Sequence, residues 1–216
     1  ADVISRYKKI FNKNVFFLTG TDEHGQKVQE AAFNLKTSAK EHVDKFHKNY
    51  KELWKKLNVD YDKFIRTTNE SHKETVKIML QRFWDNNEIY MSEYEGLYSV
   101  SEERFITEKE FSEGKFRQVT KLKEKNYFFK MSKYQTNLIK HINDNPDFIL
   151  PESRKNEILG FLKKPLSDLC ISRPKSRLTW GIEIPFDKDY VTYVWFDALL
   201  NYISAVNWNE NEENFK

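Results

Sequence analysis

The sequence predicts an α/β fold in which a parallel sheet is divided by a β-rich insertion. Two short apolar runs, Val15–Leu18 and Tyr190–Val194, are each followed by a polar turn and a helical pattern, which is typical of buried parallel strands. From Glu88 onward, short β-like segments with polar turns interrupt this order. We therefore expect the first part of the α/β fold over residues 1–87, an insertion over 88–150 and a return to the α/β fold over 151–216.

Helix signals are clearest in the first part of the chain. Apolar residues on one face predict helices at Asp2–Ile10, Gln26–Leu35 and Ser71–Trp84, and Phe64-Ile65 is expected to be a short strand. Ser38 and Glu41 have the spacing of a capping box at the start of another helix. Residues spaced three and four apart predict one buried stripe on that helix: Ala39, Val43, Phe46, Tyr50, Leu53 and Leu57.

The later elements follow from the same kinds of pattern. The insertion is expected to be antiparallel, and Pro151 is expected at the first position of a helix. A strand at Leu169–Ser172 is predicted to end at Arg173, and the strand Tyr190–Val194 to lead into a helix over Trp195–Val206. Ligands of such sheets bind at the carboxyl ends of strands. The candidate sites are therefore the turns at Thr21–Gly25, Arg173 and Trp195–Asp197.

Composition limits the kind of protein. The 216 residues, 39% of them hydrophobic, suffice for one domain that carries an insertion. No apolar run reaches the ~18–20 residues that span a bilayer, so no membrane partner is expected. A single cysteine, Cys170, excludes an internal disulfide framework and fits a reducing compartment, so we expect a cytoplasmic location, with an organellar one as the alternative. A net charge of +3 permits nucleic-acid binding without indicating it.

Asp22 and His24 are candidate site residues in the turn after the first apolar run. A carboxylate there can accept charge-assisted hydrogen bonds from a substrate ammonium. An Asp near Gly20 and Gly25 equally suits an ordinary turn that caps a helix. His24 can act as an acid or base near neutral pH, or it can bond a backbone carbonyl. Local sequence leaves both alternatives open for each residue.

Arg173, Trp195 and Tyr202 are the other candidates. The planar guanidinium of Arg173 suits a carboxylate or a phosphate, and a structural ion pair is the alternative. Trp195 and Tyr202 lie seven residues apart and so share one helix face. Aromatic walls suit a thioether side chain, because sulfur–aromatic contacts are favourable by ~0.3–1.5 kcal/mol. An aromatic stripe in the core is the competing interpretation.

Together these segments resemble the methionyl-tRNA synthetase family. The stretch Val15–Gly25 is similar to the signature that follows the second strand in that family. Further segments recur in the same order, and the resemblance covers about residues 1–208: Phe64–Thr68, Tyr127–Phe129, Asn145–Ile149, Ile171–Arg173, Trp180–Ile182 and Tyr193–Ala198. Any one segment is weak evidence, whereas six or more in order are specific.

The resemblance implies a Rossmann-like class I synthetase catalytic core split by a β-rich connective insertion. It implies activation of methionine with ATP and Mg²⁺ to methionyl-adenylate, followed by transfer to tRNA(Met). Asp22 would hold the methionine ammonium, and Arg173 would face the cleft as the second catalytic residue. Trp195, Ala198 and Tyr202 would line the methionine side-chain pocket, and His24 would lie near the site without a fixed role.

The sequence also departs from the family pattern. The His-Ile-Gly-His element expected just before Ala1 and the late Lys-Met-Ser-Lys-Ser loop are absent, so we interpret the chain as a segment that is inactive alone. Lys130-Met-Ser-Lys133 spells most of that loop, but it ends the insertion. The capping-box spacing of Ser132 and Gln135 instead predicts a helix start there.

Zinc is the second departure. Many family members carry Cys-x-x-Cys pairs in the insertion as a structural zinc site. Here Ser99 and Ser101 occupy that region, and residues 88–130 contain neither Cys nor His. We therefore predict no zinc and an insertion held by its own core, with Tyr94, Phe105, Phe111 and Phe116 as candidates.

Three rival classes compete with this interpretation. Synthetases for cysteine need a zinc that this chain cannot supply, and those for leucine, valine and isoleucine carry editing insertions longer than residues 88–150. A non-catalytic tRNA-binding or scaffold module derived from a synthetase is the main alternative. A generic α/β protein that binds another adenylated metabolite would require the ordered motifs to coincide by chance.

Overall fold

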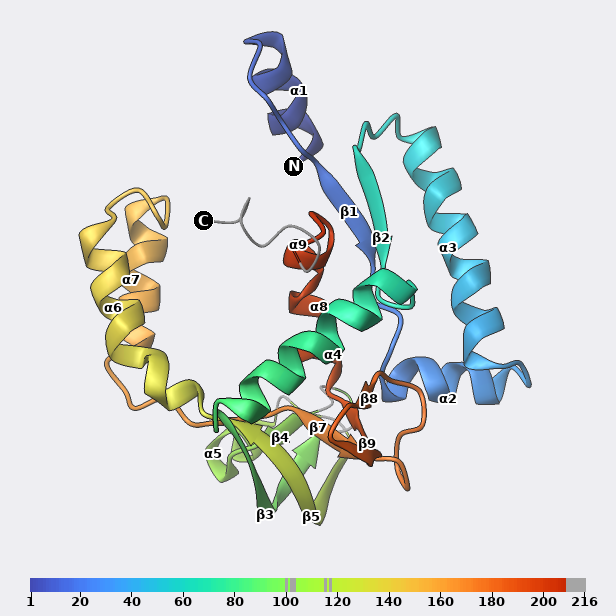
Figure 1. Cartoon of the computed structure of the whole chain (residues 1–216), viewed down its shortest axis with the longest axis vertical. Coiled ribbons are helices and arrows are strands. Elements are labelled where there is room, and N and C mark those ends of the chain that lie inside the picture. Colours follow the sequence, from blue (N-terminus) through green and yellow to red (C-terminus); the bar gives the residue numbers. More distant parts are fainter. Residues whose placement is uncertain (100, 102–103, 115, 117, 209–216) are drawn as a thin grey trace.

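A computed structural model describes residues 1–99, 101, 104–114, 116 and 118–208 (Figure 1). Its first part contains α1 (Asp2–Ile10), β1 (Leu18–Thr21), α2 (Gln26–Asn34), α3 (Ala39–Lys56), β2 (Lys63–Arg66) and α4 (Glu70–Asp85). Strands β1 and β2 pair in parallel, with α2 and α3 in the connection between them. The predicted strand–helix–strand unit is thus confirmed.

Strand β1 begins three residues later than the apolar run predicts. Before it, the Phe17 N–H donates to Asp62 Oδ2 at 2.6 Å, and the Phe17 carbonyl accepts from the Asp62 N–H at 2.9 Å, so this backbone is held in a loop. Within β1, the backbone of Gly20 lies so close to β2 that a Cβ there would sit 2.2 Å from the Ile65 carbonyl oxygen. Only glycine fits this approach.

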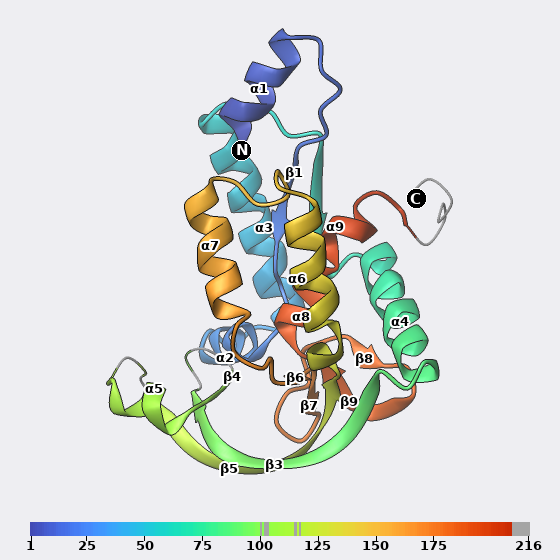
Figure 2. The ribbon, with the colours of Figure 1, turned by 90° about the vertical axis from the view of Figure 1, so that its left-hand side faces the viewer.

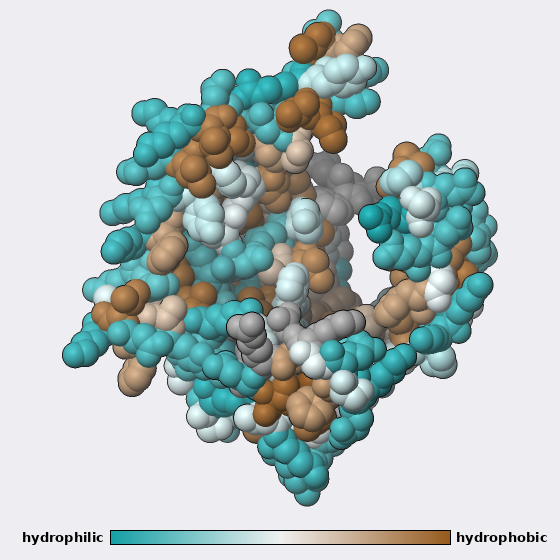
Figure 3. All heavy atoms as spheres, turned by 180° about the vertical axis from the view of Figure 1, so that it is seen from behind, coloured by the Kyte–Doolittle hydropathy of each residue, from teal (hydrophilic) through white to brown (hydrophobic). Residues whose placement is uncertain are grey.

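Helix α3 confirms its predicted start but not its buried stripe. Ser38 and Glu41 form the reciprocal capping box. Of the stripe, only Val43 is fully buried, and the larger side chains are 42–60% exposed: Phe46, Tyr50, Leu53 and Leu57. The prediction that this stripe is buried was wrong, because α2, the element that α3 contacts most, leaves the large side chains exposed. Apolar residues accordingly gather on the surface over α3 (Figure 3).

The insertion is antiparallel, as predicted. Strands β3 (Ile89–Ser99) and β5 (Val119–Phe129) form a long, curved antiparallel pair (Figure 2). Strand β4 (Arg104–Ile106) adds to one edge, and α5 (Glu108–Ser112) follows it. On the other edge, β5 pairs with β6 (Leu169–Cys170), so the insertion shares a sheet with the returning chain.

The predicted core of the insertion differs from the observed one. Phe111 is 48% exposed, Phe116 is half-buried, and the side chains of Tyr94 and Phe105 lie outside the described residues. Tyr98, Ile106 and Tyr127 are buried instead. The Arg173 guanidinium lies over the Tyr98 ring, so the insertion packs on the returning chain rather than on itself alone.

A helical pair follows β5 and stands apart from the main body (Figure 1): α6 (Gln135–Asp144), within the predicted insertion, and α7 (Glu152–Phe161), after it. A short 3₁₀ turn, η1 (Met131–Tyr134), precedes α6. The capping box at Ser132 was wrong, because its N–H and hydroxyl both donate to Asp168 Oδ1. Pro151 precedes α7 at the N-cap rather than occupying its first helical position.

The last part forms a small antiparallel sheet of order β7 (Ser172–Pro174), β9 (Asp187–Thr192) and β8 (Glu183–Ile184), followed by α8 (Val194–Leu199) and α9 (Asn201–Ser204). The single strand predicted at Leu169–Ser172 is divided between two sheets, and the long final helix is broken at Leu200. Because β7 and β9 are antiparallel, the three candidate turns do not lie along one sheet edge, which corrects that prediction.

The core joins all three parts. It contains Val76 and Leu80 of α4, Ile89 and Tyr127 of the insertion, and Ile171, Ile182, Ile184 and Phe196 of the returning chain. In the described part of the chain, no helix has the length and apolar character needed to cross a membrane.

Candidate functional site

The turn Asp22–Gly25 follows β1 and is held from two sides. Gly25 has a φ of 111°, a left-handed conformation that favours glycine. Its N–H donates to the Trp180 carbonyl at 3.2 Å, and Trp180 Nε1 donates to the Glu23 carbonyl at 2.6 Å. Glu23 and His24 are buried by these contacts, whereas Asp22 is exposed. The turn therefore presents Asp22 outward on a fixed backbone.

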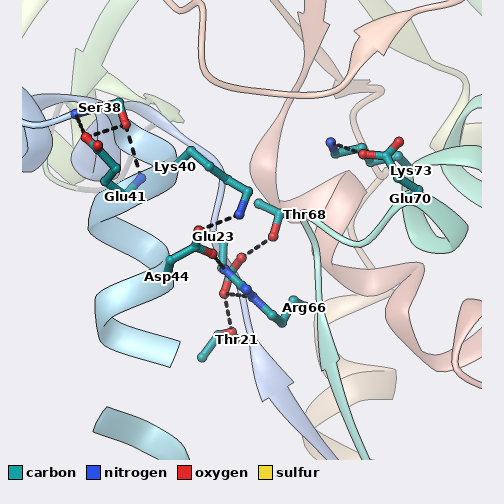
Figure 4. A network of polar contacts seen from close by, with 10 residues as sticks. All are labelled: Thr21, Glu23, Ser38, Lys40, Glu41, Asp44, Arg66, Thr68, Glu70 and Lys73. Atoms are coloured by element: carbon teal, nitrogen blue, oxygen red, sulfur yellow. Dashed lines mark hydrogen bonds and ion pairs between the residues drawn. The ribbon is translucent and has the colours of Figure 1, made fainter. Parts of the chain in front are cut away.

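Glu23 fixes the same turn to β2 (Figure 4). Its carboxylate accepts hydrogen bonds from Thr21 Oγ1 and Arg66 Nε, both at 2.7 Å, and from the Thr68 hydroxyl. Arg66 also pairs with Asp44 of α3 at 2.6 Å. With its charge shared in this way, Glu23 is a structural group, and the sequence pattern alone did not single it out.

Behind the turn, two histidines meet one buried carboxylate. His24 Nδ1 lies 2.7 Å from Asp197 Oδ2, and His72 Nε2 lies 2.6 Å from Asp197 Oδ1. His72 Nδ1 also lies 2.8 Å from Ser204 Oγ. The side chains of Asp197 and His72 are fully buried. The structure thus brings His24 together with Asp197 and His72. Asp197 lay in the candidate turn Trp195–Asp197 but was given no role, and His72 was not proposed from the sequence.

Asp22 differs from the other carboxylates of the site in its electrostatic environment. Its Oδ1 accepts a 3.3 Å hydrogen bond from Asn201 Nδ2, and within the described residues it forms no ion pair. Although the Asp22 residue is exposed to solvent, the groups packed around the turn partly desolvate its carboxyl, which raises its pKa above the usual value, and the negative charge of Asp197 adds to the rise. An anion left without a cation in this way is suited to receive a positively charged ligand group.

The predicted pocket residues lie on the two short helices beside this turn. Ala198 is buried, whereas Trp195 is 56% and Tyr202 71% exposed, which excludes the core-stripe interpretation. A cavity of about 420 Å³ adjoins Asp22, but α2 and α3 supply its other wall. The link between Asp22 and the helices is Asn201, the neighbour of Tyr202.

Arg173 lies away from the Asp22 turn. It is 3% exposed, and its guanidinium lies 4.4 Å from the Tyr193 ring centroid and 5.5 Å from that of Tyr98. Its Nη1 donates to the Ser172 carbonyl at 2.7 Å. Arg173 lines a separate cavity of about 670 Å³ between the insertion and the segment after α7. The structure therefore does not bring Arg173 to the Asp22 turn.

The insertion offers a poor fit for zinc. Ser99 is buried, and its hydroxyl is hydrogen-bonded to that of Ser101 at 3.0 Å. Hydroxyls do not substitute for the thiolates that structural zinc sites use. Across the part of the chain that the structure describes, no group of three or more His, Cys, Asp or Glu side chains is arranged to hold a metal ion.

Comparison with known proteins identifies the family. A family model described as tRNA synthetases class I (M) matches residues 1–115 and 112–216, so the chain has the catalytic fold of a class I tRNA synthetase. It is 51% identical to a methionine–tRNA ligase of Clostridium acetobutylicum and 49% identical to one of Clostridium perfringens, over 99% and 100% of the chain. The chain belongs to the methionyl-tRNA synthetase family. It spans 34% of the length of these relatives.

Solved structures agree with this assignment. The methionyl-tRNA synthetase of Mycobacterium tuberculosis bound by methionyl-adenylate superposes with a TM-score of 0.90 at 38% identity, over 98% of this chain and 43% of that one. The free form of the same enzyme gives a TM-score of 0.77 at 37% identity. The predicted class I fold is therefore confirmed.

Proposed function

We propose that the protein containing this chain is a methionine–tRNA ligase. It activates methionine with ATP, presented as the Mg²⁺ complex, and transfers the methionyl group to tRNA(Met). The observation that carries this proposal is Asp22: an exposed carboxylate, without an ion-pair partner in the described residues, at a turn fixed from behind. The adenylate complex of the M. tuberculosis relative supports methionine and ATP as the substrates.

Each predicted residue has a role in this proposal. Asp22 binds the methionine ammonium, which leaves the substrate carboxylate to attack the α-phosphorus of ATP as pyrophosphate departs. Trp195, Ala198 and Tyr202 form the walls for the thioether side chain. Exposed aromatic rings on short helices fit such walls once a ligand covers them, because sulfur–aromatic contacts favour burial. Arg173 acts from the neighbouring cavity, where it fixes the insertion beside the cleft.

Other properties belong to the same proposal. The chain is inactive alone, because the His-Ile-Gly-His element and the lysine loop that stabilise the ATP phosphates are not in it. The insertion works without zinc, since Ser99 and Ser101 bond to each other. The enzyme acts in the cytoplasm, with an organelle as the alternative.

The test is ATP–pyrophosphate exchange by the full-length protein, with methionine, leucine, valine, isoleucine and cysteine supplied separately. Exchange that depends on methionine alone is the expected result. Folded full-length protein that carries both ATP signatures and exchanges with none of the five would contradict the proposal and favour the non-catalytic tRNA-binding module.

A further inference from the structure

Asp197 joins parts of the chain that are distant in sequence. His24 comes from the turn after β1, 173 positions away, and His72 comes from α4, 125 positions away. Asp197 itself lies on α8. One carboxylate therefore ties the Asp22 turn, α4 and α8 together at a single buried point.

A second series of hydrogen bonds links His72 to Asp22. His72 contacts Ser204, and the Ser204 hydroxyl donates to the Asn201 carbonyl at 3.3 Å. Asn201 then donates to Asp22 through its side chain. The two routes enclose the segment Ala198–Tyr202, which carries two of the three proposed pocket walls.

We propose that His24 and His72 are positioning residues of the methionine site that act through Asp197. This inference rests on the proposed function. A buried carboxylate is costly unless it receives hydrogen bonds, so the two imidazoles fix where Asp197 lies. Ala198 is the next residue along the chain, and its place relative to Asp22 follows from the position of Asp197. Binding sites lose affinity when supporting groups let them shift by about 1 Å.

The two histidines use different ring nitrogens, which permits a matched test. An Asn amide nitrogen occupies the place of His Nδ1, whereas a Gln amide nitrogen occupies the place of His Nε2. His24 reaches Asp197 through Nδ1, so His24→Asn keeps the bond and His24→Gln loses it. His72 reaches Asp197 through Nε2, so His72→Gln keeps the bond and His72→Asn loses it. The same two amino acids thus have opposite effects at the two positions.

The experiment measures methionine-dependent pyrophosphate exchange by the four full-length variants, together with their thermal unfolding. We expect His24→Gln and His72→Asn to raise the KM for methionine on the order of tenfold, as when supporting groups of a binding site are lost. The KM for ATP should stay near that of the wild type. His24→Asn and His72→Gln should restore most of the methionine affinity.

The outcomes separate the possible roles. If all four folded variants bind methionine like the wild type, or if Asn and Gln act alike at both positions, the positioning role is refuted. If melting temperatures fall while the KM for methionine is unchanged, the cluster serves stability only, which also refutes it. Absence of exchange by the wild type would instead refute the proposed function itself. If the two variants at one histidine fail to fold, the two variants at the other histidine test the positioning role.

Discussion

At the scale of single residues, the site depends on which carboxylates are neutralised. Glu23 and Asp197 are buried and receive several hydrogen bonds, whereas Asp22, within the described residues, receives a side-chain hydrogen bond from the Asn201 amide alone. The site therefore contains two anions with a structural role, Glu23 of the turn and Asp197 of α8, and one that remains available to a ligand, Asp22.

The first prediction concerns methionine binding. Asp22→Ala in the full-length enzyme should weaken methionine binding by about 2–5 kcal/mol, because it leaves the substrate ammonium without its counter-charge. Equilibrium binding of methionine measures this. Asp144→Ala, an exposed residue of α6, is the matched control. Equal affinity in the Asp22 variant and the control would show that another group binds the ammonium.

The raised pKa of Asp22 also predicts a pH dependence of stability. The folded state favours the protonated carboxyl, so the ionised form costs stability once the pH exceeds the raised pKa. Asp22→Asn should therefore raise the free energy of unfolding at pH 7. The gain should shrink as the pH falls through the raised pKa and vanish below the unfolded-state pKa near 3.8. Denaturant titrations across this range measure it, and a variant less stable at pH 7 would contradict the prediction.

Neutralising Glu23 is expected to lower the free energy of unfolding, whereas neutralising Asp22 raises it. Its carboxylate is 2% exposed and pairs with Arg66, so Glu23→Gln should cost about 3–5 kcal/mol of stability, as when a buried ion pair is broken. Glu70→Gln, which removes the exposed pair with Lys73 drawn in the same view (Figure 4), should cost much less. Urea unfolding of both variants measures the loss of unfolding free energy. Losses of similar size would show that the buried pair of Glu23 and Arg66 stabilises the protein no more than the exposed pair does.

Sequence reasoning reached Asp22 and His24 because they follow an apolar run directly. It missed His72 because a single histidine within an amphipathic helix has no local signal. Its partners lie 125 and 132 positions away, and only the fold brings them together.

At the scale of elements, local signals were reliable where the interaction itself is local. The capping box of Ser38 and Glu41 closes within three residues, so the sequence contains all of it. Strand limits depend on partners elsewhere, which is why β1 starts late and Leu169–Ser172 is divided between two sheets. The exposed stripe on α3 has the same cause, since periodicity identifies an apolar face but not what covers it.

The capping box gives a prediction at this scale. Ser38→Ala should lower the stability of the protein by about 1 kcal/mol, because the Glu41 N–H loses its acceptor at the N-terminus of α3. Ser153→Ala, at an exposed position in the first turn of α7, is the control for the same change without a cap. Thermal unfolding measures both, and equal melting temperatures would rule out a stabilising cap.

At the scale of the whole molecule, the predicted fold class is confirmed, whereas the meeting of three strand ends at one sheet edge is not. That expectation assumed one continuous parallel sheet. The described chain has one parallel pair and two antiparallel sheets, and which sheet a short strand joins is decided by long-range pairing.

The surface yields the last prediction. Apolar side chains are exposed on one face of α1 (Val3, Ile4, Tyr7 and Ile10) and along α3 (Phe46, Tyr50, Leu53 and Leu57). Contiguous apolar patches of this kind promote association. The isolated 216-residue chain should therefore self-associate with rising concentration in sedimentation experiments, and Leu53→Lys with Leu57→Lys should reduce this. A chain that stays monomeric over the whole series would contradict it.

Asp197 contacts two histidines that are distant from it in the sequence, and this has a consequence for synthesis of the protein. A ribosome releases His24 and His72 early, but the carboxylate that both require is made 125 residues after the second of them. The helix α4 can form by then, yet its buried face lacks both Asp197 and the Ile182 and Ile184 of the returning chain. Contacts of such sequence separation slow folding, since the intervening chain must be ordered first. We therefore expect the turn that carries Asp22 to reach its final geometry only after Asp197 has been translated, so that within this chain the site is among the last parts to mature.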